Sequence, residues 1–214
     1  MSQQWQSVRL DEIESIPITG AGINWRPLRR TLGVEAFGIN AYVAAAAGDH
    51  VVEEHSESQL RHQEVYVVLT GHATFTLGGE TLDAPAGTVV FVRNPDVQRS
   101  AVAVVAGTSV LAIGGKAGEP YTASPWEWYF YAERFRPTED WDGGVAFLEE
   151  GAERYPDHSG MLYSLACYEA LAGRHADALA HLQRAVELEP HSLEWAAKDD
   201  DLASIRGLPD YPTA

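Results

Sequence analysis

The pattern of the 214-residue chain changes once, at the Gly- and Pro-containing stretch 114–125 (GGKAGEPYTASP). Before it, segments rich in Val, Ile, Thr and aromatic residues alternate with turn residues at spacings of roughly 8–12, which is typical of an all-β sandwich or barrel. These segments are residues 23–32, 34–44, 51–57, 62–69, 73–77, 80–83, 88–92, 101–105 and 109–113, after a lead-in with one or two helical turns at 10–16. No clear helix-period segment interrupts them, which argues against a parallel βαβ sheet.

Beyond residue 125 the period becomes helical, and the sequence repeats itself after 34 residues. Superposing residues 125–156 on 159–190 pairs Ala132 with Ala166, Gly144 with Ala178, Leu148 with Leu182, Gly151 with Ala185 and Pro156 with Pro190. Small residues where two helices approach, large apolar residues between them and a closing proline resemble the tetratricopeptide signature. Residues 193–205 predict a capping helix. We therefore expect a β domain over 1–119 and helical repeats over 120–214.

The acidic charge is uneven along the chain. The net charge is −16, of which −11 falls in residues 120–214 and −5 in residues 1–119. Such a charge repels phosphate backbones, and no basic stripe with interleaved aromatic residues is present, so nucleic acid is not an expected partner. A solvated surface explains most of the acids, and an acidic face for a basic partner is the alternative.

The chain shows neither a secretory signal pattern nor an apolar run long enough to span a bilayer, so no membrane association is expected. Its single cysteine, Cys167, excludes an internal disulfide and fits a reducing cytoplasm, which is the predicted location. Cys167 lies in the apolar helical pattern LYSLACYEALAG. This position favours a small buried residue over a nucleophile.

Four ionisable residues crowd the stretch 48–71, GDHVVEEHSESQLRHQEVYVVLTG. If residues 51–57 and 62–69 form a β-hairpin, His55 faces Glu64 and Glu57 faces His62, and all four side chains point the same way. Together they offer nitrogen and oxygen donors suited to a divalent ion such as zinc, iron, manganese or nickel. The alternative is two imidazole–carboxylate pairs that satisfy each other.

This stretch resembles the first cupin motif, G-x5-H-x-H-x3/4-E-x6-G. Gly48, His55, Glu64 and Gly71 occupy its positions with altered spacing, and Glu57 stands where a second histidine is expected. The second motif, G-x5-P-x-G-x2-H-x3-N, begins at Gly87 and then departs from the pattern, with Arg93 for Pro, Pro95 for Gly, Gln98 for His and Val102 for Asn. The resemblance covers residues 23–113 and implies a cupin jelly-roll barrel, here followed by a tetratricopeptide-like α-helical array.

In metal-binding cupins, the first motif supplies two histidines and a glutamate, and the second motif supplies a third histidine. The resemblance therefore implies a metal site at His55, Glu57 and Glu64, with His62 replacing the missing first-motif histidine. It also places Arg93, Gln98, Arg99 and Tyr66 where a polar or anionic ligand would bind. For the two arginines, the alternative is a salt bridge to nearby acids.

Three hypotheses follow. The first is a small-ligand-binding cupin of unknown specificity with little or no catalysis, whose repeats bind a protein or peptide. The second is a metal-dependent cupin enzyme of dioxygenase or isomerase type, with Glu57 as ligand or general base. The third is a homodimer formed by the barrel, with the repeats recruiting a partner.

Overall fold

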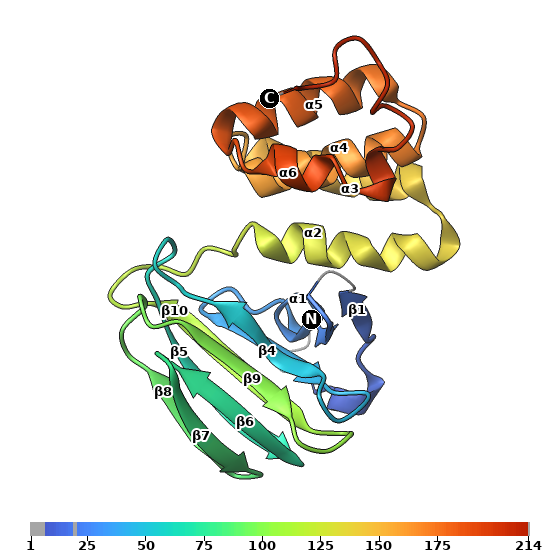
Figure 1. Ribbon diagram of the computed structural model, residues 1–214. Coiled ribbons are helices and arrows are strands. Elements are labelled where there is room, and N and C mark those ends of the chain that lie inside the picture. The colour runs from blue at the N-terminus through green and yellow to red at the C-terminus, as the bar shows by residue number, and fades with distance from the viewer. Residues whose placement is uncertain (1–6, 19–20, 214) are drawn as a thin grey trace, which may run out of the picture. The chain divides into compact units, whose positions relative to one another are not determined.

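Ten strands form two antiparallel sheets in the part of the chain that the computed structural model describes, residues 7–18 and 21–213 (Figure 1). One sheet has six strands in the order β1-β2-β3-β10-β5-β8, and the other has four in the order β4-β9-β6-β7. Their bounds are β1 Ile16–Ile18, β2 Ile23–Arg26, β3 Gly38–Val43, β4 His50–His55, β5 His62–Thr70, β6 His72–Leu77, β7 Glu80–Pro85, β8 Val89–Val92, β9 Arg99–Ala103 and β10 Ser109–Lys116. All lie in the first of two units, Met1–Ala123 and Ser124–Ala214.

The core of the first unit is built by alternation along these strands. In β8, Val90 and Val92 are buried while Val89 and Phe91 are exposed. The buried set continues through both sheets and includes Val51, Val52, Tyr66, Val68, Phe75, Ala101 and Val110. Because side chains of one strand face opposite sides of a sheet, each sheet contributes its inner face to a shared apolar layer. The described strands thus form a two-sheet sandwich, as expected for a jelly roll, and no closed barrel is found among them.

The predicted hairpin of residues 51–57 and 62–69 is wrong in its pairing. β4 pairs with β9 in the four-stranded sheet, while β5 lies between β10 and β8 in the six-stranded sheet. The connection therefore crosses from one sheet to the other, with Arg61 in the left-handed region at φ 60°. Both strands bury one apolar face, so each can pair with any strand that continues that face. Adjacency in the sequence does not decide the pairing.

Three segments of the first unit show local detail beyond the expected strands. The segment 23–32 is a strand only to Arg26, because Pro27 lacks an N–H for the ladder, and a short helix α1, Leu28–Leu32, follows it. The lead-in forms one 3₁₀ turn, η1 Leu10–Glu12. Gly114 and Gly115, where the strand-like pattern of the sequence ends, still belong to β10 and pair with Glu64 and Gln63 of β5.

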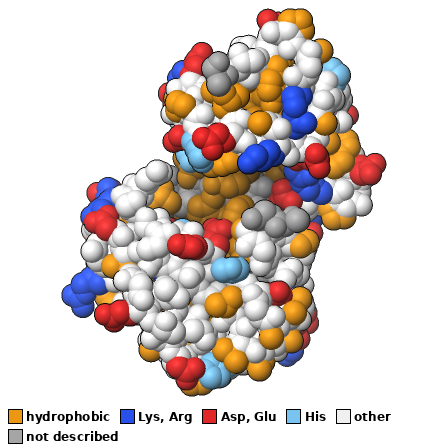
Figure 2. Space-filling view, viewed as in Figure 1, with side chains coloured by type: hydrophobic (Ala, Val, Ile, Leu, Met, Phe, Trp, Pro, Cys, Tyr) orange, Lys and Arg blue, Asp and Glu red, His pale blue; other side chains and the backbone are white. Residues whose placement is uncertain are grey.

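The second unit is helical. Its elements are α2 Trp126–Ala132, η2 Glu133–Thr138, α3 Trp141–Arg154, α4 Ser159–Leu171, α5 His175–Leu188, α6 Ser192–Ala196 and η3 Asp200–Leu202. The prediction of a single capping helix over 193–205 is wrong, since α6 and η3 are separate short elements there. Acidic side chains are scattered on the visible face of the molecule and do not gather in one patch (Figure 2). None of the described helices is long and apolar enough to cross a membrane.

The paired small positions of the internal repeat lie in the core of the helical unit. Ala132, Ala166, Ala178 and Ala185 have no exposed surface, and a Cβ added at Gly144 would lie 2.3 Å from the Tyr168 ring. Glycine at this position lets α3 approach α4 closely. The expected burial of Cys167 is confirmed, because its side chain packs in the same unit.

We expect Gly144→Ala to destabilise the helical unit by about 1–3 kcal/mol, because the added methyl group overpacks a filled core. This outcome runs against helix propensity, which by itself favours alanine by about 1 kcal/mol. The free energy of unfolding by urea measures the change. Tyr168→Leu removes the ring. In that background, Gly144→Ala should lower the free energy of unfolding less than it does in the wild type. An unchanged or raised stability in the single variant would refute the packing argument.

Candidate functional site

Ionisable side chains from both sheets converge at one end of the sandwich. β5 contributes His62 and Glu64 from one face of the strand, and β4 contributes His55 as its last residue. Glu57, in the loop that follows β4, is buried and only 7% exposed. These are the four residues that the sequence predicts to share one face. They meet across the two sheets and not as hairpin partners.

The contacts among these four side chains are close. His55 Nε2 lies 3.5 Å from Glu64 Oε2 and 3.9 Å from Glu57 Oε1. The other oxygen of Glu57, Oε2, lies 3.3 Å from His62 Nδ1. Potential metal-ligating atoms of His55, Glu57 and Glu64 all lie within 4.8 Å of one another. His62 does not belong to this three-residue group and contacts it through Glu57.

Arg99, the first residue of β9, is the cation of the cluster. It is 1% exposed, and its Nη1 donates to Glu64 Oε2 over 2.6 Å. It lies opposite His55 in the β4–β9 ladder, where the register is irregular. The guanidinium is held by backbone carbonyls as well, because Nη2 donates to Pro95 and Val97 and Nε donates to Val97. The salt-bridge alternative considered for Arg99 is therefore the arrangement found.

The other predicted ligand-binding residues fall into two groups. Tyr66 is buried, and its hydroxyl donates to Glu64 Oε2 over 2.5 Å, so it joins the cluster. Gln98 and Arg93 are exposed. The Arg93 guanidinium lies over the Phe91 ring, 5.4 Å from its centroid. The backbone carbonyl of Gln98 accepts from the amide of Gly78. Neither contact brings these two side chains to Glu64.

Two residues of the site give no signal in the sequence. The ring of Tyr121 lies 5.9 Å from that of His62, centroid to centroid, although residue 121 falls in the stretch 114–125, where the strand-like pattern of the sequence ends. Gly114 pairs with Glu64, and a Cβ there would lie 3.0 Å from Glu64 Cγ. A glycine at this position thus leaves room for the glutamate. The pairing of β10 with β5 reveals the role of Gly114, and the ring contact with His62 reveals that of Tyr121.

Burial and charge separate the protonation behaviour of the two carboxyl groups. Burial, and then the nearby charge of Glu64, raise the pKa of Glu57 to about 7. Burial also acts to raise the pKa of Glu64, but contacts with His55, Tyr66 and Arg99 outweigh it and hold that pKa below its ordinary value. Glu64 is thus a carboxylate, whereas Glu57 exchanges a proton near neutral pH.

The two imidazoles shift in opposite directions. Burial lowers the pKa of His55, but its contact with Glu64 raises it more, and the net pKa lies above the ordinary value. Burial lowers the pKa of His62, which the charge of Glu64 only partly offsets. Near neutral pH the cluster therefore combines a fixed ion pair, Arg99 with Glu64, and two groups that can give or take a proton, His55 and Glu57.

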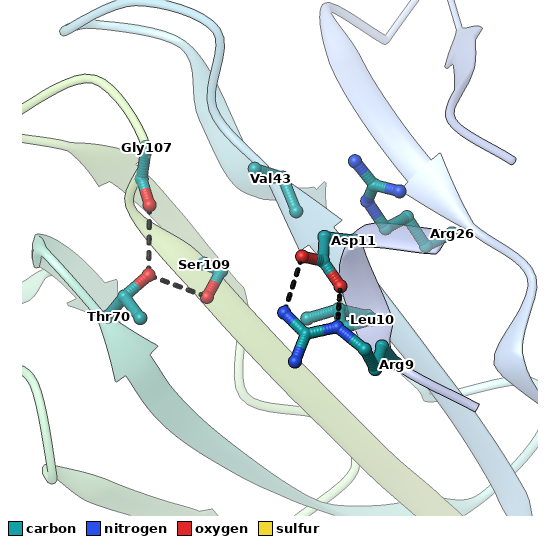
Figure 3. Close-up of a pocket in the computed structure, with 8 residues that line it drawn as sticks. All are labelled: Arg9, Leu10, Asp11, Arg26, Val43, Thr70, Gly107 and Ser109. Atoms are coloured by element: carbon teal, nitrogen blue, oxygen red, sulfur yellow. Dashed lines mark hydrogen bonds and ion pairs between the residues drawn. The ribbon is translucent and has the colours of Figure 1, made fainter. Parts of the chain in front are cut away.

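A cavity of about 450 Å³ lies in the first unit, away from the cluster (Figure 3). Its lining comes from the N-terminal segment and from the ends of β2, β3, β5 and β10, and consists of Arg9, Leu10, Asp11, Arg26, Val43, Thr70, Gly107 and Ser109. Arg9 is paired with Asp11, and the Thr70 hydroxyl donates to the Gly107 carbonyl. None of the site residues predicted from the sequence lines this cavity.

A second group of potential metal-ligating residues, Cys167, Asp199 and Asp201, lies in the helical unit. The carboxylates of both aspartates already have protein partners. The Tyr163 hydroxyl donates to Asp199 over 2.9 Å, and Arg136 donates to Asp201 over 2.5 Å. Burial, and then the charge of Asp199, raise the pKa of the Cys167 thiol well above its ordinary value. We interpret this group as a polar network that joins α4 to the C-terminal turns.

The pKa of Glu57 predicts how stability depends on pH. A carboxyl pKa raised from 4.5 to about 7 means that the folded state holds a proton that the unfolded state releases. The contribution of Glu57 is thus greatest below pH 4.5 and is lost as the pH rises through about 7, with an upper limit of roughly 3 kcal/mol. His55, whose pKa is also raised, acts in the same direction.

We expect Glu57→Gln to flatten the decline of the free energy of unfolding between pH 5 and 8, because glutamine does not titrate. Urea unfolding of both proteins at several pH values measures this slope. Glu80→Gln, at an exposed position of β7, is the control and should keep the wild-type slope. A Glu57→Gln protein with the wild-type slope would show that the proton resides elsewhere.

Solved structures similar to the chain include a cupin protein from Bacteroides fragilis, with 22% identity and a TM-score of 0.41, covering 57% of this chain and 92% of that one. Another is a sugar phosphate isomerase from a cupin superfamily, from Silicibacter pomeroyi, with 17% identity and a TM-score of 0.44, covering 52% and 76%. A third is a Streptomyces protein with uridine, with 17% identity and a TM-score of 0.38, covering 53% and 84%.

Two further comparisons found nothing. No protein-family model matches the chain, and no curated protein matches it. Cupin proteins are among the structural neighbours of the N-terminal region, and these neighbours cover about half of the chain. At these identities and TM-scores, the structural similarity supports no conclusion about the activity or the ligand of this chain.

Proposed function

We propose that the N-terminal unit is a small-ligand-binding cupin of unknown specificity with little or no catalysis. The observation that carries the proposal is Glu57 Oε2, a buried carboxylate oxygen with no hydrogen-bond partner within the described residues. His62 Nδ1 is 3.3 Å away, but not in hydrogen-bond geometry. A buried acceptor without a partner costs about 1–3 kcal/mol. A ligand that donates a hydrogen bond at this position would remove that cost.

The remaining groups of the site fit a polar ligand that carries hydroxyl groups. Glu57, with a pKa of about 7, exists in both protonation states near neutral pH and can donate or accept, and His55 adds a ring nitrogen beside Glu64. Arg99 and Tyr66 occupy Glu64 Oε2 and hold its carboxylate in place. Tyr121 adds an aromatic ring beside His62. This set binds through hydrogen bonds and one ring face, which suits a small polyhydroxylated compound.

The alternative is a metal-dependent cupin enzyme of dioxygenase or isomerase type. One observation favours it: His55, Glu57 and Glu64 offer three donor atoms within 4.8 Å of one another. These residues would hold a divalent zinc, iron, manganese or nickel ion, which as a Lewis acid polarises bound oxygen groups. His62 would then orient Glu57 from 3.3 Å. In this alternative Glu57 is a ligand or general base.

Gluconate and glucose test ligand binding as a matched anionic and neutral pair of polyols. We expect at least one of them to shift the NMR signals of the His55 and His62 rings in a saturable way, and Glu57→Gln to weaken that binding about tenfold through loss of one hydrogen bond to a charged group. Arg154→Gln, at an exposed position of α3 in the helical unit, is the control and should bind as the wild type. If neither polyol binds, this ligand class is excluded.

We also propose that the helical unit is a protein-interaction module and that the chain forms a homodimer. The net charge of −11 in residues 124–214 supports a basic partner for the helices. For the dimer, edge strand β8 exposes Val89 by 63% and Phe91 by 48% and carries neither charge nor proline. Edge strands of monomers usually carry one of these to prevent pairing.

Sedimentation velocity of the full chain, alone and with a lysine-rich peptide, tests both assemblies. We expect a dimer that Phe91→Lys converts to a monomer, and a peptide complex that weakens as salt is added. Leu82→Lys, at an exposed apolar position of β7, should leave the dimer intact. A monomeric wild-type mass at micromolar concentration contradicts the dimer, and equal binding of a glutamate-rich peptide contradicts a basic partner.

A further inference from the structure

The protein itself supplies a cation to the candidate site. We infer that the buried guanidinium of Arg99 is the resident cation of this site and excludes a metal ion from it, so that the site binds its ligand without metal. The inference rests on the proposed ligand site and extends it, because it decides between the two candidate functions. Four observations carry it: the placement of Arg99, the occupation of Glu64, the orientation of Gln98 and the bonds that fix the guanidinium.

Glu64 is the residue that a metal would need most, and its Oε2 is occupied. That oxygen accepts from Arg99 over 2.6 Å and from Tyr66 over 2.5 Å. Both lone pairs are thus used. An ion on Glu64 would have to displace one of these donors or use the other oxygen within a few ångströms of a guanidinium, which cannot lose its proton. The repulsion between a dication and that fixed charge opposes binding.

Arg99 cannot move aside at low cost. Its side chain has no exposed surface, and three of its hydrogen bonds end on the backbone carbonyls of Pro95 and Val97. The Pro95 carbonyl also accepts from the amide of Glu57. The same turn therefore holds both the cation and the second carboxyl group. Withdrawing the guanidinium would break this turn and leave Glu64 buried without its counter-charge.

The sequence of β9 explains why an arginine is in the site. Gln98 stands where the second cupin motif has its histidine, but this side chain is exposed. The next residue, Arg99, is the one buried and paired opposite His55. Successive side chains along extended backbone point to opposite faces. The position that faces the site is thus 99, and it supplies a positive charge instead of a neutral imidazole donor.

Metal content and metal affinity test the inference. Untagged full-length protein is treated with chelator, incubated separately with Zn²⁺, Mn²⁺, Ni²⁺ and anaerobic Fe²⁺, desalted and measured by elemental analysis. We expect far less than one equivalent of each ion on the wild type. Arg99→His should bind close to one equivalent of Zn²⁺, and Glu64→Gln in that background should abolish it. Arg93→His, which makes the same substitution at an exposed position, should bind no more Zn²⁺ than the wild type.

The wild-type measurement decides the question even if Arg99→His fails to fold. One equivalent of metal on the wild type that Glu64→Gln removes would overturn the inference and support the enzyme alternative. A folded Arg99→His protein that binds no more Zn²⁺ than the wild type would also overturn it. Chelator-treated wild type that still binds gluconate or glucose supports it. A metal-free protein that binds neither polyol also supports the metal exclusion, while removing the proposed ligand class.

Discussion

The ion pair between Arg99 and Glu64 joins the two sheets of the N-terminal unit at the end where the candidate site lies. Arg99 begins β9 of the four-stranded sheet, and Glu64 lies in β5 of the six-stranded sheet. Their contact at 2.6 Å is largely removed from water. Breaking such a pair by removing one partner typically costs about 3–5 kcal/mol, because an uncompensated charge stays buried. Tyr66 donates to the same oxygen of Glu64, and His55 lies 3.5 Å from it, so the ion pair stands at the centre of the site.

The electrostatics of the site follow from that pair. Contacts with His55, Tyr66 and Arg99 keep Glu64 ionised. Burial, and then the charge of Glu64, raise the pKa of Glu57, and the contact with Glu64 raises the pKa of His55. Glu57, with a pKa of about 7, therefore exchanges a proton near neutral pH, beside a histidine whose pKa is also raised. A site of this kind can form hydrogen bonds whose donors and acceptors change with pH, whether or not it carries out a reaction.

The sequence predicted a large part of the architecture. Turn residues between short apolar segments indicated the strands, and the change of period after residue 125 indicated the helical part. What it could not predict was which strands pair, since β4 and β5 each bury one apolar face and either could continue the sheet of the other. It also could not predict Tyr121, or Gly114 beside Glu64, because both act through contacts between residues distant in the chain.

The sequence by itself indicated that His55, Glu57, His62 and Glu64 would gather, because they alternate along two neighbouring segments, although Glu57 lies in the loop after β4 and not in a strand. It also determined the burial of Cys167 and of the small residues of the helical repeat, through their apolar helical spacing. Only the tertiary structure decided that these four side chains meet across two sheets and that Arg99, and not Gln98, joins them. The physical reason is that strand register selects which of two neighbouring residues faces inward, and register is set by pairing with distant strands.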